Sequence, residues 1–374
     1  MLNMVAPRVF CTCTAVRLYV QAIMQIKYIK KSKKNSIIGK EAMSYEPKSF
    51  EDLLKEVEEE YKAHQRIEEE VSEDDLYCDF PISDTVDCQI LLHRDIHFGG
   101  SFPHMIEYYE KGGKGVAPDI TTDRIRYLAA IEKDHGENLA ANYFSSWETE
   151  QVTRGRELYK QLRNLYENND EGSFVPKLIA DLILSEEEEP EKEILALIEQ
   201  GPMIIPLLAD LLRSERFQDP LSPGYGTAPQ NAARCLGKMK HADAIPHLFE
   251  SLGSDDFAME STATKALLEI GDSAEEFLQT RLQSQPLGND NEWAALALSR
   301  FPLNPKTAEL ALKQLEKEEV RRLDTLAPYL VLLCEALQEE TLRRHFLSLI
   351  ESPETPKYLH LDMQTVANSW ENES

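Results

Sequence analysis

The chain has 374 residues, of which 66 are acidic and 40 are basic, so its formal net charge is −26. This length allows two domains. The acidic composition argues against a general nucleic-acid-binding surface, because phosphate backbones need basic patches, and it favours partners with basic segments.

The first 42 residues differ sharply from the rest, with eight basic residues and one acid, Glu41. Arg8 and Arg17 interrupt the apolar run that a secretory signal needs. An organelle transit peptide would have this composition, but we favour a natural start at Met43. Residues 1–42 are therefore expected to be a disordered basic leader or an over-extended start. No uninterrupted run reaches the roughly 20 apolar residues of a membrane span.

Residues 43–170 are predicted to form a smaller, mostly helical N-terminal region. Ser49 is typical of a helix N-cap, and the helix after it is predicted to run to about Val71. Residues 76–120 contain several glycines and prolines and are predicted to be irregular, apart from a short helix at about 104–111. Helices are expected again at about 122–133 and 148–168.

One segment of this region carries candidate metal ligands. Five residues fall close together in the sequence: Cys78, Cys88, His93, His97 and His104. If the segment were helical, His93 and His97 would share a face, as metal ligands do. Residues 89–98 read as extended, however, and no Cys-x-x-Cys or His-Glu-x-x-His motif is present. The alternative is that these side chains satisfy the backbone of a long ordered loop.

The six cysteines show no spacing typical of a disulfide framework, which favours a reducing, cytoplasmic location. Cys235 and Cys334 lie in apolar helical stripes and are expected to be buried. The glycine-rich stretches do not match a phosphate-binding loop, and no nucleophile elbow is present.

The C-terminal half carries a loose internal repeat. Apolar residues at i, i+3, i+4 and i+7 indicate one face of a helix, and this spacing starts at Ile205, Ile245, Ala274, Ala308 and Leu342. Each stripe follows another apolar helix rich in small residues. Helix pairs repeated every 30 to 40 residues are typical of a stacked solenoid. We assign residues 171–360 to this repeat domain and 361–374 to a C-terminal tail. An ordinary all-α globular domain is the alternative.

The repeat resembles the HEAT-like family, in particular the short bacterial type of the phycobilisome lyases. The resemblance rests on residues 232–237 with 244–248 and on residues 263–272, and it covers about residues 172–350. It implies an all-α fold, an α/α superhelix, in which the second helix of each pair lines a concave face used for protein contacts.

The leading hypothesis is a non-catalytic scaffold or adaptor that binds another protein and needs no cofactor. A tetrapyrrole-lyase-like enzyme is one alternative, and a metal-dependent function of the Cys/His segment is another. Deoxyhypusine hydroxylase, a HEAT-like enzyme, holds iron through His-Glu pairs, and this chain contains no His-Glu dipeptide.

Exclusion from the apolar stripes predicts which residues face outward on the second helices. These are Asp210, His247, Glu250, Glu275, Gln279, Glu309 and Lys313, with Arg343 and Arg344 reversing the charge near the end. Most are acidic or neutral. The sequence therefore predicts a groove, acidic along most of its length, that takes a basic or mixed-charge protein segment.

Overall fold

The structure is a computed structural model that describes residues 85–115, 117, 119–167, 174–254 and 256–372. The described residues all belong to one compact unit. The expectations for residues 1–42, for the start at Met43, for the helix after Ser49 and for Cys78 lie outside the described residues.

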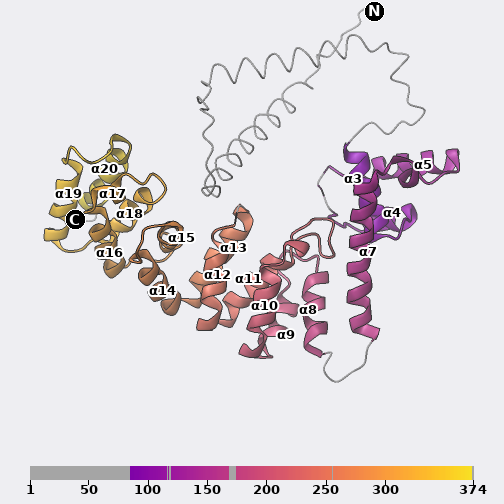
Figure 1. Ribbon diagram of the computed structural model, residues 1–374, viewed down its shortest axis with the longest axis horizontal. Coiled ribbons are helices and arrows are strands. Elements are labelled where there is room, and N and C mark those ends of the chain that lie inside the picture. Colours follow the sequence, from indigo (N-terminus) through magenta and orange to yellow (C-terminus); the bar gives the residue numbers. More distant parts are fainter. Residues whose placement is uncertain (1–84, 116, 118, 168–173, 255, 373–374) are drawn as a thin grey trace, which may run out of the picture. The chain divides into compact units, whose positions relative to one another are not determined.

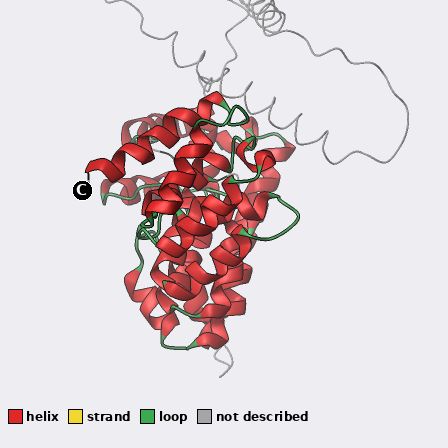
Figure 2. Cartoon of the chain, turned by 90° about the vertical axis from the view of Figure 1, so that its left-hand side faces the viewer, coloured by secondary structure: helices red, strands yellow, loops and turns green. Residues whose placement is uncertain are grey.

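Every regular element that the structure describes is a helix, so the all-α prediction is confirmed (Figure 2). The first five are α3 (Thr85–His97), α4 (Phe102–Glu110), α5 (Thr122–His135), α6 (Leu139–Tyr143) and α7 (Ser146–Glu167). Ser101 caps α4, since its side chain accepts from the backbone N–H of His104. The helices predicted at about 104–111, 122–133 and 148–168 correspond to α4, α5 and α7.

The prediction of an irregular segment with extended residues 89–98 is wrong, because α3 is a regular helix. Its apolar run Ile90-Leu91-Leu92 is buried throughout, so no polar face marks the helical period. α3 packs closely against α7 at Gly155 of α7. A Cβ at this position would come within 2.6 Å of the Ile96 side chain of α3. Because α3 is buried on several sides, its sequence contains a continuous apolar run, which is also typical of a buried strand.

Residues 174–372 form successive helix pairs, which follow α7 along the chain (Figure 1). α8 (Phe174–Leu184) precedes five pairs, each packed against its neighbours in the sequence. The pairs are α9 (Glu191–Ile198) with α10 (Ile205–Leu212), α11 (Ala228–Met239) with α12 (Ile245–Ser251), α13 (Phe257–Ile270) with α14 (Asp272–Leu282), α15 (Asn289–Leu298) with α16 (Pro305–Leu315), and α18 (Ala327–Leu333) with α19 (Glu340–Ile350). α17 (Glu318–Arg321) lies between the last two pairs, and α20 (Lys357–Asn372) ends the described chain.

The predicted apolar stripes form the core of these pairs. Ile205, Leu208, Ala209 and Leu212 are buried, and one hydrophobic cluster runs from α7 to α20. Small residues allow close approach of the first helices. A Cβ on Gly237 of α11 would lie 2.6 Å from the Cα of Ala266 on α13.

The boundary placed at residue 360, between the repeat domain and a C-terminal tail, falls inside α20. Met363, Val366 and Trp370 are buried in the repeat core. The indole Nε1 of Trp370 donates to the backbone carbonyl of Glu335 at 2.9 Å. This helix covers the last pair as a terminal cap, which solenoids need to shield their apolar end.

Among the described helices, no single one is both long and apolar enough to cross a membrane. One bent helix pair, Glu191–Ile198 with Pro202–Leu212, is long and apolar enough for a membrane span when the two helices are taken together. The bend between the two helices is 109°.

Candidate functional site

The second helices present only some of the predicted residues to solvent. Asp210 on α10, and Glu309 and Lys313 on α16, are exposed as expected. His247 on α12 is half-buried and Glu250 is exposed, but both are engaged by the preceding pair. The predicted row of outward charges is therefore partly used within the chain.

Arg213 links two consecutive pairs. Its Nη2 donates to Glu250 at 2.9 Å and to Nδ1 of His247 at 2.6 Å. Because the Arg213 charge balances the Glu250 carboxylate, this part of the face is less acidic than the sequence predicts. The pair is exposed and contributes little to stability, at most about 1 kcal/mol.

Gln279 corrects the sequence prediction, because it is buried rather than outward-facing. Its Nε2 donates to Oγ1 of Thr307 at 2.9 Å and to Oε1 of Glu275 at 3.3 Å. The same Glu275 oxygen accepts from Asn304 Nδ2 at 2.6 Å and from Thr307 Oγ1 at 2.9 Å. Three donors thus hold the half-buried Glu275 carboxylate in one orientation between α14 and α16.

The two arginines predicted to reverse the charge are both engaged within the chain. Arg343 is half-buried, donates through Nε to the backbone carbonyl of Leu337 at 2.7 Å, and lies over the Trp370 ring. Arg344 is exposed and pairs with Glu340 one turn earlier. The positive charge at this end is therefore weaker than the sequence suggests.

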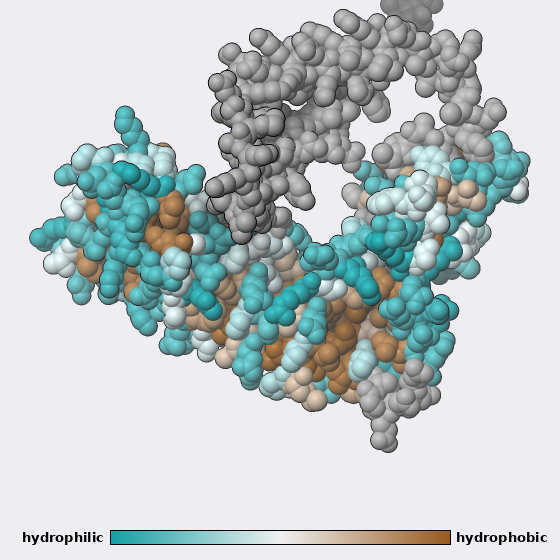
Figure 3. All heavy atoms as spheres, in the orientation of Figure 1, coloured by the Kyte–Doolittle hydropathy of each residue, from teal (hydrophilic) through white to brown (hydrophobic). Residues whose placement is uncertain are grey.

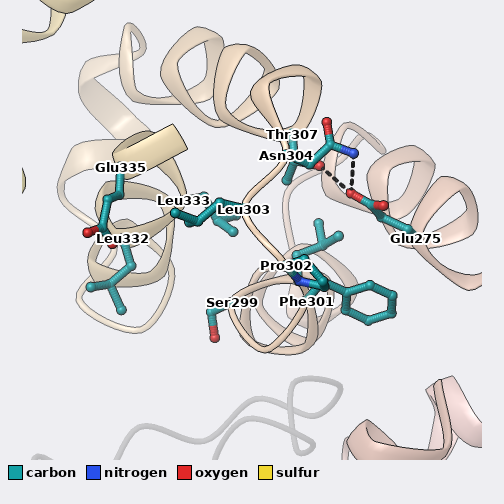
Figure 4. A pocket seen from close by; sticks show the side chains of 11 residues that line it. Glu275, Ser299, Phe301, Pro302, Leu303, Asn304, Thr307, Leu332, Leu333 and Glu335 are labelled. Atoms are coloured by element: carbon teal, nitrogen blue, oxygen red, sulfur yellow. Dashed lines mark hydrogen bonds between the residues drawn. The ribbon is translucent and has the colours of Figure 1, made fainter. Parts of the chain in front are cut away.

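A small hollow of about 140 Å³ lies beside the Glu275 network (Figure 4). The loop between α15 and α16 separates two of its walls. Glu275, Asn304 and Thr307 lie on one side, and Leu332 and Glu335 on the other. Leu298, Ser299, Phe301, Pro302, Leu303 and Leu333 complete the lining.

This hollow combines an apolar wall with two acids. Its lining contains two carboxylates and no lysine, arginine or histidine. Leu303 and Leu332 are 60% and 48% exposed, although large apolar side chains usually lie inside. The hollow is well below the 300–1,000 Å³ typical of small-molecule and cofactor sites, so its size suits a single side chain.

The candidate metal ligands are only partly brought together. His93 and His97 share one face of α3, with ring centroids 4.7 Å apart. Cys88 is on the preceding turns of α3, whereas His104 is exposed on α4. Across the described part of the chain, no three histidine, cysteine or acidic side chains gather as metal ligands would.

Tyrosines surround these histidines instead. Nδ1 of His93 hydrogen-bonds with the Tyr109 hydroxyl at 3.2 Å and Nε2 with the Tyr225 hydroxyl at 3.3 Å. His97 hydrogen-bonds through Nδ1 with the Tyr159 hydroxyl at 2.7 Å. Burial lowers the pKa of His93 to about 3 and that of His97 to about 4. Both rings are therefore neutral at ordinary pH.

Tyr225 reaches this cluster from the loop between α10 and α11. Its backbone has a φ of 55°, which is unusual for a residue with a side chain, and Gly224 and Gly226 beside it also have positive φ. A Cβ on Gly224 would come within 1.8 Å of the Ile183 carbonyl oxygen. The loop is thus packed tightly on α8, and the His/Tyr cluster joins it to α3, α4 and α7.

A comparison with known families identifies part of this series of helix pairs. Residues 226–299, from the start of α11 to the end of α15, match the family model for HEAT repeats. This part of the chain consists of HEAT repeats. No curated protein sequence matches it.

The helix pairs also expose large apolar side chains away from the hollow. Leu195 on α9, Leu207 on α10 and Met203 between them are exposed, Met203 by 75%. Figure 3 shows hydrophobic side chains gathered at the surface over α8, α9 and α10. Exposed apolar patches of this kind mark contact sites for other proteins.

Sequence reasoning missed the walls of the hollow and the tyrosines around His93. Glu335 and Leu332 belong to a different pair from Glu275, so no spacing in the sequence joins them. The repeat register could have suggested Asn304 and Thr307, since Asn304 is the N-cap of a second helix and Thr307 lies in its first turn. The motif Gly224-Tyr225-Gly226 could have marked a constrained loop.

Proposed function

We propose that this chain is a non-catalytic scaffold or adaptor that binds another protein through its HEAT repeats. HEAT repeats commonly mediate protein–protein contacts. The observation that carries the proposal is the hollow at the α15–α16 loop, where exposed Leu303 and Leu332 flank two acids from different pairs. Protein interfaces combine an apolar centre with polar groups around it, and this lining offers both kinds of surface in one place.

The alternatives have less support. Beyond the repeat itself, the described residues offer nothing specific to a tetrapyrrole lyase. The metal-dependent alternative has only two facing histidines, each already hydrogen-bonded to tyrosine. The buried thiols Cys235 and Cys334 are free, which supports the proposal of a cytoplasmic protein.

Capture of partners from the native host, followed by binding measurements with the purified partner, tests this function. The variant Leu303→Asp with Leu332→Asp should lose the partner, because two charges replace the apolar rim. Phe257→Asp, at an exposed position in the first turn of α13, is the matched control and should retain it. A partner that binds the double variant as tightly as the wild type, or fails to saturate in calorimetry, would contradict the proposal.

A further inference from the structure

We propose that the hollow at the α15–α16 loop anchors a lysine or arginine side chain of the partner protein, with an apolar partner residue beside it. This inference rests on the proposed function and names the chemistry of the partner at one site. Its basis is the combination of two acids, an apolar wall and a volume of about 140 Å³ in one place.

Charge selects the occupant. Glu275 and Glu335 both line the hollow, and no cationic side chain lines it with them. The donors from Asn304, Thr307 and Gln279 all reach Oε1 of Glu275. These neutral groups orient the carboxylate without cancelling its charge, so it is arranged to receive a cation.

The arrangement of apolar and acidic groups in the hollow also favours a lysine or arginine side chain. Lysine and arginine have an aliphatic stem and a charged head, and the stem packs along apolar surface while the head reaches a polar partner. Leu303 and Leu333 lie between the two acidic walls in Figure 4. A cationic side chain could lay its stem along these leucines and bring its head to one of the two carboxylates. A neutral apolar side chain would instead leave both carboxylates without a counter-charge.

The outer rim provides for a neighbouring apolar residue. Leu303 and Leu332 both line the hollow and are exposed to solvent. Covering them with a leucine or an aromatic side chain beside the cation would remove apolar surface from water, worth about 25 cal/mol per Å². The structure therefore assigns a short motif of one basic and one apolar residue to this site.

A phage-displayed library of random 12-residue peptides, selected on the full-length protein, tests the motif without a known partner. Selected peptides should be enriched in a basic residue next to an apolar one. For a selected peptide, Glu275→Gln should weaken binding about tenfold, as expected for loss of one desolvated charge pair. Gln keeps the shape and still accepts the three hydrogen bonds. The control Glu276→Gln, an exposed neighbour on α14, should change the affinity less than twofold.

Replacing the basic residue of the peptide by a neutral isostere, citrulline for arginine or norleucine for lysine, completes a double-mutant cycle. The replacement should weaken binding to the wild type but not to Glu275→Gln. A second double-mutant cycle with Glu335→Gln tests the opposite wall of the hollow. The test can then still be read if one of the two variants fails to fold. Peptides without basic residues, or a replacement that costs equally in wild type and both variants, would overturn the anchor but leave protein binding intact. If the wild type enriches no peptides over a control protein, the proposed function fails as well.

Discussion

His93 and His97 lie one turn apart on α3, and their rings meet edge-on with centroids 4.7 Å apart. Burial keeps both neutral, and the proximity of His97 lowers the pKa of His93 further. Tyr109 and Tyr225, whose pKa values burial raises, face His93 with protonated hydroxyls. Protonation of either histidine in the folded chain is therefore disfavoured.

This arrangement makes stability depend on pH. In the unfolded chain a histidine titrates near 6.5, whereas in the folded chain His93 and His97 titrate at about 3 and 4. Between these values the unfolded chain binds more protons. The free energy of unfolding should thus fall as pH drops below about 6.5, by up to about 1.4 kcal/mol per histidine and pH unit, and remain insensitive to these groups above it.

Urea unfolding from about pH 7.5 to about pH 5.5 measures this slope, in a range where most carboxylates stay ionised. His93→Gln should flatten the slope, since one of the two titrating groups is gone. His97→Gln should flatten the slope in the same way, because burial lowers the pKa of His97 as well. Equal slopes for the wild type and His93→Gln would show that the buried histidines do not control stability.

Gly237→Ala should destabilise the repeats by roughly 1–3 kcal/mol, although alanine normally favours a helix. The added Cβ would lie 2.6 Å from the backbone Cα of Ala266 and would push α11 away from α13. Thermal unfolding compares this variant with Gly288→Ala, where nothing lies within 4 Å of the added atom. A melting temperature as high as that of the wild type would mean that the two helices can separate without cost.

Leu248→Asp should cost roughly 3 kcal/mol or more, because it buries an unpaired charge within the repeat core. Leu248 on α12 is fully buried among the apolar stripes. Leu207→Asp on α10 is the control, since Leu207 is exposed and should change stability by about 0.5 kcal/mol or less. Denaturant midpoints measure both, and similar values for the two variants would contradict the assignment of this face to the core.

Trp370→Ala should cost about 3–5 kcal/mol, because it removes the large buried side chain that holds α20 on the last pair. The indole packs edge-on against Phe346, with centroids 5.4 Å apart, and its N–H donates to the Glu335 carbonyl. Leu361→Ala, exposed on the same helix, should be nearly neutral. If calorimetry finds Trp370→Ala as stable as Leu361→Ala, α20 is a dispensable tail after all.

The sequence by itself determined the helix class, the pairing of helices and most of the repeat core. The stripes starting at Ile205, Ile245 and Ala308 are buried as their spacing predicts, because a helix with one apolar face must cover it against a neighbour. The short helix α4 also followed from a local signal, the glycines after its end.

Only the tertiary structure decided the helical state of α3, the capping role of α20 and which side chains of the second helices face solvent. α3 is enclosed on several sides, so its run of Ile90, Leu91 and Leu92 lost the period that marks a helix. The outward face could not be read by exclusion, since Gln279 turns inward to Thr307. Glu275 and Glu335 lie 60 residues apart in the sequence. Only the stacking of successive helix pairs places both in the lining of the same hollow.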